Sequence, residues 1–189
     1  MRGVIILAGG RGTRMGGVDK ASVILAGERL IDRLVRQLPY GMPTAVVSPY
    51  RLGMPQVCES PLFGGPVAGI AAGHAALSDL ALSTTAALAV DAPDSPQMLP
   101  ALAAALEDSD ADVAVATLDG HLQPLCALWR TKALQRALDE LGDPRDQPVM
   151  RLLRLAENVA HVAGTEAVRD IDTVDELRAR REARQATRR

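Results

Sequence analysis

The chain has 189 residues, of which 48% are hydrophobic and 23% charged, so it has enough apolar material for one sizeable core and a single domain over residues 1–189. Its formal net charge of −2 gives no general attraction to nucleic acid or to an acidic membrane surface, and we expect neither as a partner. The two cysteines lie in apolar, strand-like contexts, which indicates buried thiols in a reducing compartment. The three histidines are scattered and have no metal-ligand spacing.

No targeting or membrane-spanning segment is visible in the sequence. The apolar run after Arg2 is too short for a signal-peptide core and ends in glycines. A longer apolar stretch at 75–90 is interrupted by Asp79 and by three hydroxyl residues at 83–85. We therefore expect a cytoplasmic protein.

The amino-terminal part begins with an apolar run that has no charge after Arg2, which is typical of a central strand covered on both faces. A turn at Gly27 leads into an amphipathic helix over 29–38, in which leucines recur at helical spacing until prolines stop the helix. The strands predicted in this part cover residues 2–8, 22–25, 44–48 and 56–58.

Strand-like and helix-like segments continue to alternate along the chain, which predicts an α/β fold. We expect a three-layer α/β/α sandwich around a mostly parallel central sheet. The last predicted helix starts at Thr173 and runs into an arginine-rich tail over 178–189. The other helices are predicted at 66–77, 97–107, 131–141 and 149–157, and the strands at 84–90, 112–118, 124–129 and 159–163.

The loop after the first strand is the most informative segment, and residues 7–21 read LAGGRGTRMGGVDKA. Glycines let backbone N–H groups crowd around an anion, and Arg11, Arg14 and Lys20 add fixed positive charge. The loop opens at the carboxyl end of a strand, where open α/β sheets bind their ligands. The chain has only one other lysine, Lys132, so a lysine in this loop favours a functional role over a chance surface position. The loop is therefore expected to cradle phosphates.

Two better-known glycine motifs do not fit this loop. A Walker loop ends in Gly-Lys-Ser/Thr, whereas Lys20 follows Asp19 and precedes Ala21. A dinucleotide fingerprint that starts at Gly10 would place Met15 where the third glycine belongs. A nicotinamide oxidoreductase is disfavoured for this reason and because no acidic residue is suitably placed after a second strand.

The segment LAGGxxxRMGGxDK resembles the signature of the molybdenum cofactor guanylyltransferase family. These nucleotidyltransferases have the GT-A-like, or nucleotide-diphospho-sugar transferase, fold. Related cytidylyltransferases that act on the same pterin tend to carry alanine in place of Gly9 and lack the Asp19-Lys20 pair. The resemblance implies transfer of GMP from GTP to the phosphate of molybdenum-loaded molybdopterin, with release of pyrophosphate. It implies nucleotide contacts from Leu7, Ala8, Gly9, Gly10, Gly12, Arg14 and Lys20.

The expected mechanism is an in-line displacement at the α-phosphorus, in which the enzyme positions the reactants and stabilises charge. Arg14 would neutralise charge on the leaving pyrophosphate, and Lys20 would contact the α-phosphate. The loop amides of Gly9, Gly10 and Gly12 would hold the β- and γ-phosphates.

A second group of residues, AVDAPD at 89–94, places an acid where an apolar strand stops. A divalent cation that bridges carboxylate and phosphate oxygens would orient the α-phosphate and offset its charge. The resemblance implies that Asp91 coordinates Mg²⁺ and belongs to the catalytic residues with Arg14 and Lys20. This requires the strands at 2–8 and 84–90 to be neighbours, as the family topology implies. Asp94 fits an ordinary turn and helix N-cap.

Further nucleotide contacts are expected from Glu59, Ser48 and Gly65, and Glu59 would select the base. Guanine offers two adjacent donors on its Watson–Crick edge, and the Glu59 carboxylate can accept both, although a solvated surface glutamate is the alternative reading. Ser48 stands where relatives often have asparagine near the base or ribose. Gly65 belongs to the Gly-Gly-Pro turn that points the start of the 66–77 helix into the crevice.

Several alternatives stay open at the level of sequence. A cytidylyl- or sugar-phosphate nucleotidyltransferase shares the fold, and a non-catalytic nucleotide-binding accessory to cofactor delivery belongs to a different class. The molybdopterin acceptor, and a molybdoenzyme or delivery protein as its receiver, follow from resemblance only. Asp170 and Asp172 fit either the family's carboxyl-terminal turn near the metal or pterin, or ordinary turn formation.

Overall fold

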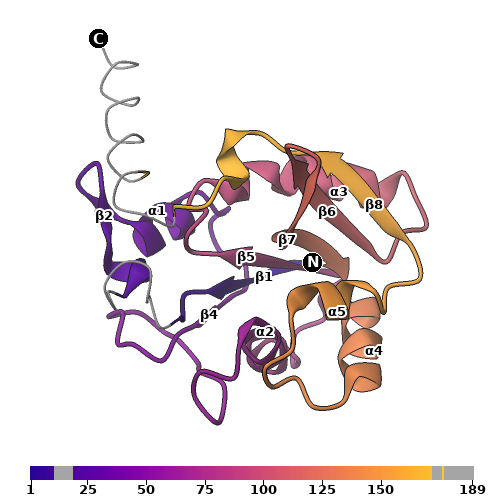
Figure 1. Cartoon of the computed structure of the whole chain (residues 1–189), viewed down its shortest axis with the longest axis horizontal. Coiled ribbons are helices and arrows are strands. Elements are labelled where there is room, and N and C mark those ends of the chain that lie inside the picture. The colour runs from indigo at the N-terminus through magenta and orange to yellow at the C-terminus, as the bar shows by residue number, and fades with distance from the viewer. Residues whose placement is uncertain (11–18, 172–175, 177–189) are drawn as a thin grey trace.

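A six-stranded sheet forms the centre of the molecule (Figure 1). The computed structural model describes residues 1–10, 19–171 and 176. The sheet order is β4-β1-β5-β7-β6-β8, and every neighbouring pair is parallel except the two that involve β7. The predicted mostly parallel sheet is therefore confirmed. The strands are β1 (Arg2–Leu7), β4 (Thr44–Val47), β5 (Thr84–Ala89), β6 (Val113–Leu118), β7 (His121–Arg130) and β8 (Val159–Ala163).

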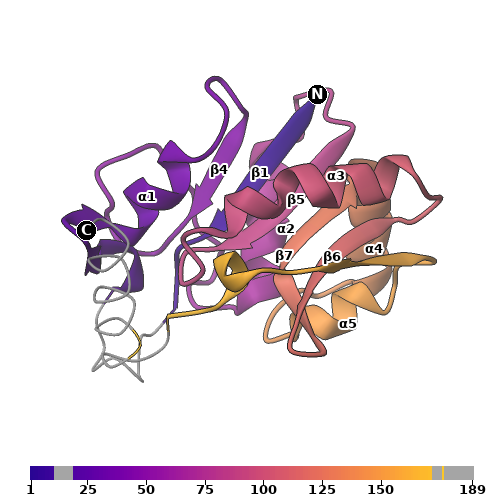
Figure 2. The ribbon, with the colours of Figure 1, turned by 90° about the horizontal axis from the view of Figure 1, so that it is seen from above.

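Helices cover both faces of the sheet and complete the predicted three layers. One apolar cluster joins α1 and α3 to one face, which Figure 2 views from above, and a second cluster joins α2, α4 and α5 to the other. The side chains of β1 divide between them, because Val4 and Ile6 face the first cluster while Ile5 and Leu7 face the second. The helices are α1 (Leu30–Arg36), α2 (Pro66–Ala76), α3 (Leu99–Glu107), α4 (Thr131–Leu141) and α5 (Val149–Leu153).

Helix α2 packs unusually close to the sheet, as its small residues predicted. A Cβ atom on Gly73 would lie 2.5 Å from Ile5 Cγ2, and one on Gly69 would lie 2.9 Å from Leu7 Cδ2. Glycine at these two positions lets the helix axis approach β1, and the amino-terminal end of the helix thereby reaches the carboxyl end of that strand.

Several predicted elements differ from the structure in their bounds. The strand expected at 22–25 is instead a 3₁₀ helix (Lys20–Ser22) followed by the two-residue β2 (Ile24–Leu25), which pairs with β3 (Glu28–Arg29). The strand expected at 56–58 is reduced to one bridge between Val57 and Val47. As a result Cys58 is exposed, contrary to the prediction of two buried thiols, whereas Cys126 is buried as expected.

Strand β7 extends beyond the predicted 124–129, because a shift in its pairing register with β6 accommodates Pro124. The pairing register with β6 shifts between Val115 and Ala116, so that Val115 pairs with Ala127 and Ala116 with Gln123. Pro124 lies in the skipped part of the ladder, where its missing N–H is not needed.

Two further helices differ from their expected bounds. The helix expected at 97–107 begins at Leu99, and a 3₁₀ helix (Ser95–Met98) precedes it, with Pro96 and Pro100 near the starts of the two segments. The helix expected at 149–157 ends at Leu153. The helix predicted from Thr173 and the tail at 178–189 lie outside the described residues. Within the described parts of the chain, no helix has the length and apolar character needed to cross a bilayer.

Candidate active site

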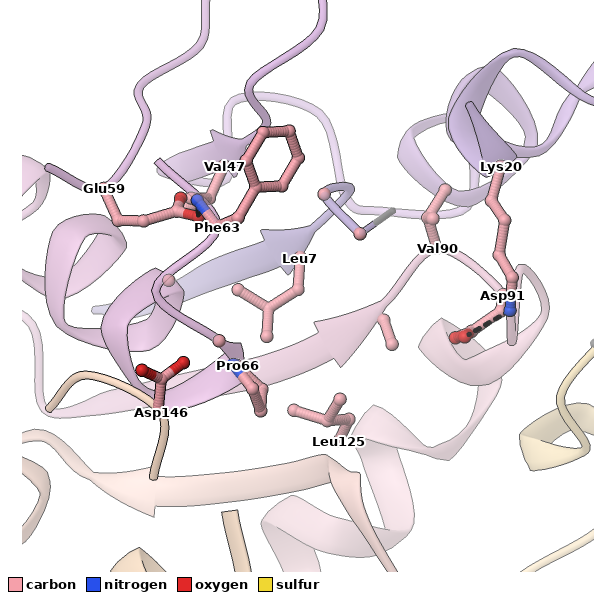
Figure 3. A pocket seen from close by; sticks show the side chains of 15 residues that line it. Leu7, Lys20, Val47, Glu59, Phe63, Pro66, Val90, Asp91, Leu125 and Asp146 are labelled. Atoms are coloured by element: carbon pink, nitrogen blue, oxygen red, sulfur yellow. Dashed lines mark hydrogen bonds and ion pairs between the residues drawn. The ribbon is translucent and has the colours of Figure 1, made fainter. Parts of the chain in front are cut away.

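A cavity of about 450 Å³ lies where β1, β4 and β5 end, and Leu7, Val47 and Ala89 line it (Figure 3). These three residues are register partners, since Leu7 pairs with Val47 on one side and with Ala89 on the other. The expected neighbourhood of the first strand and the strand before Asp91 is thus confirmed. The cavity lies at the sheet edge where parallel α/β folds bind ligands.

Most of the predicted nucleotide-binding residues that the structure describes line this cavity. Those that do so are Leu7, Gly9, Gly10, Lys20, Glu59, Gly65 and Asp91. Ala8 and Ser48 lie behind the cavity wall and are both buried. Gly12 and Arg14 lie outside the described residues, so their expected contacts stay predictions.

The start of the glycine loop is held by the segment that follows β4. The N–H of Ala8 donates to the Val47 carbonyl at 2.9 Å, and the Ser48 hydroxyl donates to the Ala8 carbonyl at 3.2 Å. The Ser48 hydroxyl also accepts from the N–H of Tyr50 at 3.1 Å, and the Tyr50 hydroxyl donates to the Gly10 carbonyl at the same distance. In this structure Ser48 therefore supports the loop from behind.

Close packing explains why glycine occupies the first position of this loop. A Cβ atom on Gly9 would lie 2.9 Å from Pro49 Cδ, closer than van der Waals contact allows. Gly10 adopts a φ of 148°, which favours glycine. Pro49, which removes a backbone donor, thus shapes the loop by its ring; the sequence alone carried no signal of this contact.

Lys20 is presented to the cavity by a capped 3₁₀ helix. Asp19 is the N-cap, and its carboxylate accepts from the N–H of Ala21 at 3.0 Å and from the Ser22 hydroxyl at 2.6 Å. The Asp19-Lys20 pair of the sequence motif therefore combines a cap with a cation that lines the cavity. Lys20 Nζ lies 3.3 Å from Asp91 Oδ2, which joins the two predicted catalytic residues across the cavity edge (Figure 3).

Asp91 has one carboxylate oxygen that no described residue satisfies. Oδ2 pairs with Lys20, whereas Oδ1 is buried and has no hydrogen-bond partner within the described residues. A buried carboxylate oxygen without a partner is costly, and a divalent cation would satisfy it. Among the described residues, no cluster of three or more acidic, histidine or cysteine side chains could hold a metal ion alone. A cation at Asp91 would take its other ligands from phosphate and water, as Mg²⁺ commonly does.

The turn that carries Asp91 is anchored by a buried ion pair between Arg33 and Asp94. The side chains of Arg33 and Asp94 are only 8% and 6% exposed. Asp94 stands at the N-cap position of the helical turn that follows it, as predicted, but its side chain makes no capping bond there and pairs with Arg33. Gln37 adds a second link by donating to the Pro93 carbonyl at 2.7 Å. Because α1 follows the Lys20 helix in the chain, it ties Lys20 and Asp91 into one unit.

The opposite end of the cavity is formed by turns. The Glu59 carboxylate accepts from the N–H of Phe63 at 3.0 Å and lines the cavity, so the protein orients this side chain. The Phe63 ring also lines the cavity and meets Tyr50 edge to face, with ring centroids 6.2 Å apart. Asp146, from the loop between α4 and α5, was not predicted as a site residue, yet it lines the same end.

The carboxyl-terminal turn reaches Asp91 from behind. The N–H of Ile171 donates to the Asp91 carbonyl at 2.9 Å. Burial raises the pKa of the Cys126 thiol to about 12, and the nearby charge of Asp170 adds to this shift. Asp170 directly precedes Ile171 in this turn but does not line the cavity, while Asp172 lies outside the described residues.

Residues 4–166 match the model of the MobA-like NTP transferase domain. The chain belongs to this family. The molybdenum cofactor guanylyltransferase of Acidiphilium cryptum is 34% identical over 152 residues, which is 75% of this chain and 74% of that protein. The enzyme of the same name from Cupriavidus pinatubonensis is 33% identical over 190 residues, 92% of this chain and 93% of that protein.

A solved structure shares the fold over almost the whole chain. The molybdopterin-guanine dinucleotide biosynthesis protein A from Archaeoglobus fulgidus superposes with a TM-score of 0.72, covers 98% of this chain and 100% of that chain, and is 22% identical. The resemblance drawn from the glycine-loop motif is therefore confirmed, as is the nucleotidyltransferase fold. The match to this family excludes the nicotinamide oxidoreductase alternative.

Proposed function

We propose that this protein transfers GMP from GTP to the phosphate of molybdenum-loaded molybdopterin, giving molybdopterin guanine dinucleotide and pyrophosphate. The family match and the guanylyltransferase relatives support this reaction. The observation that carries it is the Lys20–Asp91 pair beside Gly9 and Gly10 in one cavity. A site that only bound a nucleotide would not need an ammonium and a half-satisfied carboxylate at the place of phosphoryl chemistry.

The proposed chemistry needs no general base, because the attacking phosphate is already ionised near neutral pH. The chain's contribution is to align the acceptor with the α-phosphorus and to stabilise the charge of the transition state. Gly9 and Gly10 present their backbone to the β- and γ-phosphates, together with Gly12, and Arg14 balances the leaving pyrophosphate. Lys20 meets the α-phosphate, from a position 3.3 Å from Asp91.

Asp91 is the residue we assign to Mg²⁺. Its buried Oδ1, which has no hydrogen-bond partner among the described residues, fits a cation ligand. When bound, Mg²⁺ would offset the negative charge of the triphosphate and help orient it. We assign Asp170 no direct contact with the metal or the nucleotide.

The guanine base is assigned to the end of the cavity that Glu59 and Gly65 line. The Glu59 carboxylate is held by the Phe63 N–H and can accept two adjacent donors of the guanine edge. Leu7 supplies an apolar floor between the two ends. Ala8 and Ser48 act in this proposal through the loop that they support. A cytoplasmic location, and a molybdoenzyme or delivery protein that receives the product, remain predictions.

The deciding experiment offers the protein each of the four ribonucleoside triphosphates with Mg²⁺ and molybdenum-loaded molybdopterin, and identifies the dinucleotide by mass. We expect the guanine dinucleotide and one equivalent of pyrophosphate. A cytosine product would assign the protein to the cytidylyltransferases. Tight GTP binding without pyrophosphate release would assign it to the accessory class. Omission of the pterin is the matched control, and it should abolish pyrophosphate release.

A further inference from the structure

Two carboxylates other than Asp91 face the cavity, and both stand at its base end. Figure 3 shows Glu59 and Asp146 on one side of Leu7, with Lys20 and Asp91 on the other. The two acids come from separate turns that are tied to neighbouring residues. The N–H of Phe63 donates to Glu59, and the carbonyl of the next residue, Gly64, accepts from the N–H of Asp146 at 2.7 Å.

Asp146 is held in place through its backbone, which leaves its carboxylate unengaged. Its φ of 54° lies in the left-handed region, which aspartate tolerates better than most residues. Gly65 lies against this loop, since a Cβ atom there would be in van der Waals contact with Asp146 Cα at 3.6 Å, and its own φ of 90° favours glycine. Within residues 1–10, 19–171 and 176, no group forms a hydrogen bond or ion pair with the Asp146 side chain. Because its backbone is tied to Gly64 and its exposed carboxylate lines the cavity, Asp146 can accept hydrogen bonds from a ligand.

The donor pattern of guanine calls for a second acceptor. Its ring N1–H and its 2-amino group together offer three hydrogens, and one carboxylate can accept N1–H and one amino hydrogen. The other amino hydrogen would lose a water partner on entering the cavity, and a donor left without a partner reduces affinity. Glu59 by itself therefore satisfies guanine only in part.

We propose that Asp146 is a specificity-determining residue that accepts the second hydrogen of the guanine 2-amino group, while Glu59 accepts N1–H and the first. This inference rests on the proposed use of GTP. The pair of acids also disfavours adenine, because adenine N1 is an acceptor and would face the Glu59 carboxylate.

The test compares GTP with ITP, whose hypoxanthine keeps N1–H but lacks the 2-amino group. Dissociation constants are measured by calorimetry with Mg²⁺ for the wild type, Asp146→Gly and Asp146→Asn. Glycine suits the left-handed backbone, so Asp146→Gly removes the carboxylate without strain. The exposed Glu140→Gln on α4 removes the same charge outside the cavity and is the matched control.

We expect the wild type to bind GTP at least about tenfold more tightly than ITP, in line with a hydrogen bond to a charged group. Asp146→Gly should lose this preference by weakening GTP alone, and Asp146→Asn should keep part of it. Glu140→Gln should match the wild type. The inference is overturned if the wild type does not distinguish GTP from ITP, or if Asp146→Gly preserves the preference or weakens both nucleotides equally. Failure of the proposed function gives a different result, namely that the wild type prefers CTP to GTP.

Discussion

The two ends of the cavity are built in different ways. The phosphate end consists of residues that follow β1 and β5 directly, and two adjacent parallel strands deliver Gly9, Gly10 and Asp91 to one edge. The base end consists of Glu59, Phe63 and Asp146, which stand on turns that meet through a single backbone hydrogen bond. Charge chemistry is thus attached to the rigid sheet, while base recognition depends on the packing of loops.

This comparison predicts that the phosphate end controls turnover. Asp91→Asn removes the carboxylate charge but keeps the shape, so we expect kcat to fall by up to about a thousandfold, with little change in the free energy of unfolding. Steady-state kinetics and thermal melting measure the two effects. Asp79→Asn, which changes an exposed acid outside the cavity lining, is the charge control. Full Mg²⁺-dependent turnover in Asp91→Asn would remove the metal assignment.

The Arg33–Asp94 ion pair, which lies behind the phosphate end, should contribute to the stability of the fold as well as to turnover. Arg33→Met removes the charge that pairs with the buried Asp94 carboxylate, so we expect the free energy of unfolding to fall by about 3 kcal/mol. Urea denaturation measures this loss. Arg33→Met combined with Asp94→Asn removes both charges and should recover much of it. The GTP-to-ITP affinity ratio should stay unchanged, because α1 does not hold the base end; a changed ratio would mean that the two ends are not independent.

Lys20 should affect rate more than nucleotide affinity. Lys20→Met keeps most of the side-chain length and removes the ammonium, and we expect kcat to fall about a hundredfold. The only other lysine in the chain, the exposed Lys132, offers a matched control as Lys132→Met. An equal loss in both variants would show that general charge, and not the position of Lys20 beside Asp91, sets the rate.

A substitution at the base end should have a smaller effect, and that effect should be on nucleotide affinity. Glu59→Gln can still accept from the Phe63 N–H but loses its charge, so we expect about a tenfold weaker affinity for GTP. ITP should weaken as well but to a smaller degree, because it carries N1–H and lacks the amino hydrogen that Glu59 also accepts. Calorimetry with both nucleotides measures this. A fall in kcat without a change in affinity would contradict the assignment of Glu59 to the base.

The sequence by itself determined the elements of the phosphate end. Apolar runs that stop at Ala8 and Val90 identified two buried strands, and the residues after them, from Gly9 and at Asp91, carried the chemistry. This works because a ligand edge of a parallel sheet lies immediately after its strands, within local reach of the pattern. The family resemblance of the loop motif followed from the same local stretch of chain.

Only the tertiary structure decided what surrounds these residues. Arg33 looked like one polar position of an amphipathic helix, and nothing local showed that it would be buried against Asp94. Asp146 belongs to a loop more than eighty residues beyond Glu59, and its place in the cavity depends on how that loop packs on Gly64 and Gly65. Burial, ion pairing and the meeting of loops are long-range properties, because they depend on which distant segments the folded core brings together.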